Sequence, residues 1–184
     1  MNKSDIENRT EDCKFWLNAV SVQLDRIRIS FAENLTLVRL GERKKKSVES
    51  PYLTEYSKSS AQLWADIHFL YISLNHLRIA INRRGVRQEI KELAFDEQTA
   101  EIAENLRHIF EHWDKTKVAF ERDLNKKEAA KWYDENHPNK TPWSLSLDAN
   151  GFIISGVLDV NKLQSVVTAL ENKFFKIGEE ESYD

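Results

Sequence analysis

The chain has 184 residues, a net charge of −3, 5 glycines and 3 prolines. This length can bury one sizeable core, and the low glycine and proline content favours a mainly helical domain. No run is apolar and long enough to span a bilayer, and the N-terminus does not resemble a signal peptide. The single cysteine, Cys13, excludes an intrachain disulfide and any multi-cysteine zinc site. We therefore expect a cytoplasmic protein that contacts no membrane, with Cys13 buried in the first helix.

The first half of the chain predicts two long helices. Apolar residues spaced three and four apart predict a helix from Asp5 to Leu40, and Gly41 followed by lysines is a typical helix end. The polar segment 42–60 is predicted to be a loop. The second helix, residues 63–81, is apolar around most of its circumference and is expected to be central in the bundle. Its heptad-like stripe predicts antiparallel packing and consists of Leu63, Ile67, Leu70, Leu74, Leu77 and Ile81.

Several polar residues of these two helices have an ordinary structural explanation. His68 and His76 are interpreted as core or interface groups rather than ligands, and Asp66 is near enough in sequence to share a crevice with His68. The basic clusters at 39–46 and 78–91 are interpreted as solvated helix ends, where cations lie near the negative end of the helix dipole.

The second half predicts one more long helix, a hairpin and a final helix. Residues 96–125 are amphipathic, whereas residues 126–142 contain two prolines and are predicted to be a fraying helix end and a connector. Asn150-Gly151 lies between two short apolar runs, which is a strong hairpin signal. Asp159 is the predicted N-cap of the final helix, and the acidic tail 179–184 is expected to be disordered.

The predicted fold is mainly α, an up-and-down helical bundle with long antiparallel helices plus one β-hairpin near the C-terminus. Residues 1–125 would form the bundle. Residues 126–184 would supply the connector, the hairpin and a C-terminal helix that pack on the same bundle.

The most chemically dense stretch is Leu106 to Asp114 in the third helix, which contains an arginine, a glutamate and two histidines. One interpretation is a solvated polar face in which Arg107 and Glu111 form an ion pair one turn apart. A second is a zinc site, because His108, Glu111 and His112 match the inverted zinc-protease spacing. Zinc needs a third protein ligand, for which Glu128 and Glu171 are the only downstream glutamates before the tail that we expect a compact fold to bring close. Neither lies in a recognisable motif, so we predict no metal and no cofactor.

The sequence Arg107-His108-Ile109-Phe110-Glu111-His112 resembles the Arg-x4-6-His motif of HEPN domains, the higher-eukaryote and prokaryote nucleotide-binding helical bundles. The segments 66–70 and 106–114, taken together, are similar to sequences of a group of uncharacterised bacterial HEPN-like proteins. The resemblance covers residues 5–124. It implies a homodimeric, metal-independent ribonuclease of a defence, stress or toxin–antitoxin setting, with RNA and a cognate antitoxin or regulatory protein as partners.

In that interpretation Arg107 and His112 are catalytic, with His108 and Glu111 in support. Histidine titrates in the range needed for acid–base work, and arginine holds a phosphate with a planar fork of donors. Glu104 and Glu111 on the same face would repel phosphate unless they are paired with an arginine. The alternative from another class is a non-catalytic helical module in which this face mediates dimerisation or regulation.

Overall fold

The computed structural model describes residues 3–44, 51–93, 97–110, 124–140, 142, 144–148 and 151–181. Within this part of the chain the fold is mainly helical, with six helices and a small three-stranded antiparallel sheet near the C-terminus. The predicted fold class is confirmed. The predicted division of the chain after residue 125 stays a prediction.

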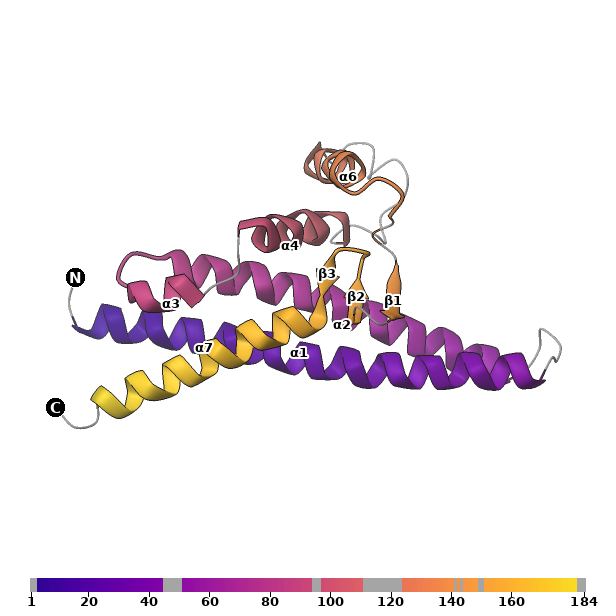
Figure 1. The fold of residues 1–184 in the computed structure, drawn as a ribbon, viewed down its shortest axis with the longest axis horizontal. Helices are drawn as coiled ribbons and strands as arrows, with labels where there is room; N and C mark the ends of the chain where they lie inside the picture. The colour runs from indigo at the N-terminus through magenta and orange to yellow at the C-terminus, as the bar shows by residue number, and fades with distance from the viewer. Residues whose placement is uncertain are drawn as a thin grey trace.

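Two long helices, α1 (Lys3–Lys44) and α2 (Pro51–Asn82), lie side by side along the whole molecule (Figure 1). Both are longer than predicted. α1 continues through Gly41, so the predicted stop at this glycine is wrong. α2 begins at Pro51, within the segment predicted to be a loop; proline suits the first turn of a helix, where its missing N–H would have no helical partner.

The predicted apolar stripe of α2 is fully buried against α1, which confirms the packing of this pair. Cys13 is also buried, as predicted, and burial is the main cause that raises the pKa of its thiol to about 11. The α1 side of the core consists of Cys13, Leu17, Val20, Leu24 and Ile27.

Three shorter helices follow: α3 (Gln88–Leu93), α4 (Glu97–Phe110) and α6 (Leu124–Asn136). α4 begins one residue after the predicted start of the third helix. α3 was not predicted, and the predicted connector after residue 125 is wrong, because residues 124–136 form α6. Ala129 and Tyr133 are buried side chains of α6, and this helix packs on α4, which in turn packs on α2 (Figure 1).

The predicted hairpin is confirmed as β1 (Leu145–Asp148) and β2 (Gly151–Ile154), in which Leu147 faces Phe152 across the pair. A short third strand, β3 (Leu158–Asp159), pairs antiparallel with β2 and extends the hairpin to a sheet. Phe152 stacks on Phe31 of α1 with ring centroids 4.4 Å apart, so the sheet rests on the long helices, as a small sheet must in water.

The final helix, α7 (Val160–Glu181), begins where the sequence predicts. The Asp159 carboxylate accepts hydrogen bonds from the backbone amides of Asn161 at 2.8 Å and Lys162 at 3.1 Å, so the predicted N-cap is confirmed. α7 crosses α1 (Figure 1). Six apolar residues spaced three and four apart on α7 are buried: Val160, Leu163, Val167, Leu170, Phe174 and Ile177. The helix extends to Glu181. The predicted disorder of the tail is therefore wrong for residues 179–181, whereas residues 182–184 lie outside the described part.

A buried chain of hydroxyl groups ties α2, α6 and the sheet together. The Ser155 hydroxyl donates its proton to the Pro142 carbonyl at 2.6 Å. It therefore accepts the hydrogen bond from the Tyr71 hydroxyl, which also lies at 2.6 Å. The Tyr133 hydroxyl donates to the Ser155 carbonyl. Burial is the main cause that raises the pKa of both tyrosines, that of Tyr133 to about 12, so both remain donors at neutral pH. Ser155 itself has a positive φ of 53°, which these contacts hold in place.

None of the helices in the described ranges combines the length and apolar composition that crossing a membrane requires.

Candidate functional site

The described part of the motif is the last turn of α4. Ile102, Leu106 and Ile109 are buried and fix the orientation of the helix. Arg107 and His108 therefore lie at the border of the apolar face, and both side chains are half-buried. This arrangement agrees with the amphipathic pattern of the sequence. Glu111 and His112, the other two predicted site residues, lie outside the described residues.

Arg107 and His108 contact each other. A terminal guanidinium nitrogen of Arg107 lies 3.0 Å from Nε2 of His108. Arginine remains protonated in proteins, so Arg107 donates and Nε2 accepts in this contact. His108 thus orients the guanidinium without placing a negative charge beside it.

The neighbouring carboxylate of Glu104 is paired with an arginine of the same chain. Arg78 of α2 donates to Glu104 at 2.7 Å and to the Asn75 side-chain oxygen at 3.2 Å. The side chains of Arg78 and Glu104 are 32% and 42% exposed, so salt screens their attraction and the pair is a modest contributor to stability. The pair offsets the negative charge of Glu104, which lies one helical turn before Arg107.

The partners of Asp66 come from α1 and from its own helix. Asp66 is buried at the α1–α2 contact, where it meets Arg26 at 2.8 Å, Ser30 at 3.2 Å and Gln62 at 3.1 Å. His68 is two residues away, about 200° around the helix, so the two side chains leave α2 in different directions. His76 stacks on Trp16 with ring centroids 4.2 Å apart, which agrees with its interpretation as an interface group.

The residues of the predicted zinc alternative are only partly described. Among the described ranges, no three histidine, cysteine, aspartate or glutamate side chains gather as metal ligands would. Of the three motif residues only His108 belongs to those ranges. Both downstream candidates, Glu128 and Glu171, are exposed on α6 and α7.

A pocket of about 240 Å³ was missed by sequence reasoning. It lies between the first half of α4, the turn after α6 and the start of α7. His137, Lys140 and Lys162 line it. His137 and Lys140 lie in the segment predicted to be a fraying end and a connector, and Lys162 lies near the start of the predicted final helix. Their only sequence signal is two lysines and a histidine within 26 residues of each other, which is too common a composition to indicate a site.

Comparisons with known proteins found no matching family model, no matching curated protein and no matching solved structure.

Proposed function

We propose that the chain is a HEPN-like RNA-binding protein that acts as a metal-independent endoribonuclease in a defence, stress or toxin–antitoxin setting. The observation that carries the proposal is the half-buried Arg107 on α4, which contacts His108 and is flanked by a Glu104 that already pairs with Arg78. A phosphate binder needs a retained positive charge in a fixed direction, and this arrangement supports both requirements. His112 contributes to the proposal through the sequence motif alone.

The proposed reaction uses the 2′-hydroxyl of RNA as the nucleophile. His112 of one subunit removes the 2′-hydroxyl proton, and the 2′-oxygen attacks the adjacent phosphorus. The bond to the 5′-oxygen breaks, and a second His112 protonates this leaving oxygen. The products are a 2′,3′-cyclic phosphate and a 5′-hydroxyl. Arg107 stabilises the negative charge that develops on the phosphorane oxygens.

One helix supplies one arginine and one histidine, whereas the reaction uses both a base and an acid. A two-fold homodimer that brings two such helices together supplies two of each. The proposal therefore includes a cytoplasmic homodimer, with a cognate antitoxin or regulatory protein as a further partner.

The test is cleavage of labelled RNA by the purified protein in EDTA. We expect His112→Ala to lower the cleavage rate by about 100-fold or more and Arg107→Ala by about 100- to 1000-fold. Arg84→Ala is the matched control, since Arg84 is exposed and lies outside the motif; it should cleave at the wild-type rate. Absence of cleavage by the wild type, or an unchanged rate in His112→Ala, overturns the enzymatic proposal.

The second candidate, a non-catalytic helical dimerisation module, is favoured by a different observation. Phe15, Val22 and Ile29 on α1 are 64%, 44% and 61% exposed, and they recur every seven residues on the face opposite the core. A seven-residue apolar repeat is the pattern of helices that associate with a partner helix. Val22→Glu should then shift the wild-type dimer to monomer in sedimentation, whereas the exposed Asn172→Glu on α7 should not. A monomeric wild type rules this candidate out.

A further inference from the structure

The apolar repeat of α1 lies on a face that the neighbouring elements leave exposed. α1 meets α2 at Ser30, α7 at Arg28 and the sheet at Phe31. At about 100° per residue, the repeat falls on the outer side of the helix, between the directions of Arg28 and Ser30. This face therefore keeps three large apolar side chains in water: Phe15, Val22 and Ile29.

The same face continues into a hollow towards the C-terminal end of α1. The hollow has a volume of about 530 Å³ and lies between α1 and the first turns of α2. Ala32, Glu33 and Thr36 line it, and they follow Ile29 at the spacing of neighbours on one helix face. The carboxylates of Glu33 and Glu55 are on exposed residues, so they can stay in water at the rim when an apolar group enters.

A protruding aromatic ring and a hollow thus lie on one face of one helix. Phe15 is 64% exposed, and the centre of the hollow is about 29 Å further along α1. When two copies pair about a two-fold axis, residue i contacts residue j and residue j contacts residue i. An antiparallel pairing of two such faces puts each ring at the hollow of the other copy, whereas a parallel pairing puts ring against ring and leaves both hollows empty.

The face is large enough for a stable dimer. From Phe15 to Thr36 it is about 32 Å long, and with α2 beside α1 it is about 20 Å wide. A second copy would cover about 600 Å² on each partner, which reaches the lower limit of specific stable interfaces, about 1,200 Å² in total. The seven-residue repeat also suits the knobs-into-holes contact of paired helices, in which four residues of the facing helix surround each apolar side chain.

We propose that this face binds a second copy of the chain, with the two α1 helices antiparallel and Phe15 of each copy in the hollow of the other. The two-fold axis then passes close to Asp25, midway between the ring and the hollow. The proposal rests on the dimerisation candidate for its apolar repeat, and it adds the direction of pairing and the hollow. It does not rest on RNA cleavage, because α4 packs on a different side of α2, through Arg78 and Glu104.

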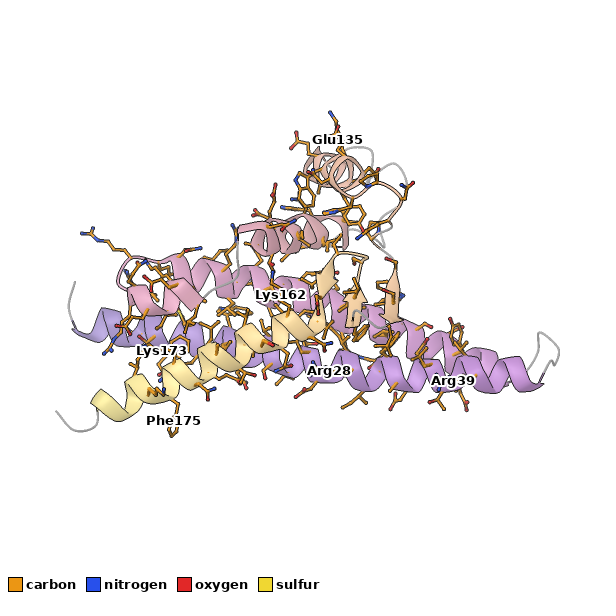
Figure 2. All side chains as sticks on the ribbon, in the orientation of Figure 1. Arg28, Arg39, Glu135, Lys162, Lys173 and Phe175 are labelled. Carbon is orange, nitrogen blue, oxygen red and sulfur yellow. The ribbon has the colours of Figure 1, made fainter. Side chains whose placement is uncertain are left out.

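Sedimentation of the full chain tests the contribution of the ring. The wild type should be a dimer, and Phe15→Ala should raise its dissociation constant by about 10- to 100-fold, because both copies lose a buried ring. Phe175→Ala is the matched control and should dissociate like the wild type, since Phe175 is 68% exposed and projects from α7 away from α1 (Figure 2). A dimer that Val22→Glu dissociates but Phe15→Ala leaves unchanged overturns this proposal and leaves the dimerisation candidate standing; a monomeric wild type overturns both.

Cysteine cross-linking tests the direction of pairing. Asn18 and Asp25 are both exposed on α1, and Cys13 is buried, so an introduced cysteine is the accessible thiol among the described residues. In the antiparallel dimer the two Asp25 positions meet at the axis, where the cysteine also removes two opposed carboxylates, whereas the two Asn18 positions lie about 20 Å apart. Oxidation should therefore link Asp25→Cys at least about tenfold faster than Asn18→Cys, since a disulfide needs closely spaced residues. Equal rates, or faster linking of Asn18→Cys, contradict the antiparallel arrangement.

Discussion

The α1–α2 pair and the α4–α6 pair are both contacts between helices, but they are stabilised by different kinds of side chain. The contact of α1 with α2 is centred on buried apolar residues, between Cys13 and Ile27 of α1 and between Leu63 and Ile81 of α2. The buried residues of α6, which packs on α4, are only Ala129 and Tyr133 among its described side chains, and Tyr133 depends on a hydroxyl bond to the sheet. Apolar burial dominates the α1–α2 contact, whereas α6 has fewer buried side chains and a hydroxyl contact to the sheet.

This difference predicts where the molecule opens first. Regions with few buried apolar contacts open at lower free energy than the core does. Arg107 lies on α4, between these two regions. α4 packs on α2 on one side and on α6 on the other, and we expect α6 to be the less stable of the two neighbours. The predictions below, from the largest expected effect to the smallest, measure this contrast.

The largest effect is expected in the α1–α2 core. Leu70 is fully buried, and Leu70→Ala should lower the free energy of unfolding by about 2–5 kcal/mol through lost burial and the resulting cavity. Urea unfolding measures it. The adjacent Phe69 is 54% exposed on the same helix, so Phe69→Ala is the matched control and should change the stability by a much smaller amount. Similar losses in both variants would contradict the assignment of the core to the Leu70 side of α2.

A smaller effect is expected where hydroxyl groups replace aliphatic packing. Tyr133→Phe removes the donor to the buried Ser155 carbonyl and should cost about 1–3 kcal/mol. Hydrogen exchange should then accelerate in α6 but not in the middle of α1. Tyr56→Phe provides the control, because Tyr56 is only half-buried near the start of α2. Equal acceleration in α6 and in the middle of α1 would show that the two regions unfold as one unit.

The same contrast explains which elements the sequence could predict. The α2 stripe, the hairpin and the Asp159 cap follow from local rules: apolar spacing, an Asn-Gly turn and a capping side chain. The first turns of α2 were missed because their contact with α1 is partly polar, as in the 2.8 Å hydrogen bond from Asn34 to Ser60. No period in the sequence indicates such a contact.

α6 was missed for a related reason. Its sequence is highly charged, and Tyr133, which is buried, donates its hydroxyl hydrogen bond to Ser155, a residue distant in the chain. For the candidate site, the sequence correctly predicted that Arg107 and His108 lie on an amphipathic helix. It could not reveal that Arg78, 26 residues earlier, pairs with Glu104, nor that His137 and Lys162 line one pocket.

The cap of α7 should have an intermediate effect, since α7 packs on the α1–α2 frame but begins at the pocket. Asp159→Ala leaves two backbone amides without their acceptor and should cost about 1 kcal/mol. Thermal or urea unfolding measures this loss. Asp159→Asn keeps an oxygen acceptor of similar shape and should retain most of the stability. A full loss in the asparagine variant would mean that the negative charge, rather than the capping geometry, matters at this position.

The smallest effect is a pH dependence that originates in the α4–α6 region. Burial and Lys140 lower the pKa of His137 below its ordinary value of 6.5, while Glu101 raises it. The unfolded chain therefore binds a proton at this position more readily than the folded chain does, so stability is greatest above pH 6.5 and falls as the pH drops through 6.5 towards the lowered pKa. Urea unfolding at pH 8, 7, 6 and 5 measures the slope. In His137→Gln the slope should be shallower across this window, whatever the change in stability at pH 8, because glutamine does not titrate. Identical slopes would mean that His137 titrates alike in both states, and the α4–α6 region would then lack the desolvated histidine that distinguishes it from the α1–α2 frame.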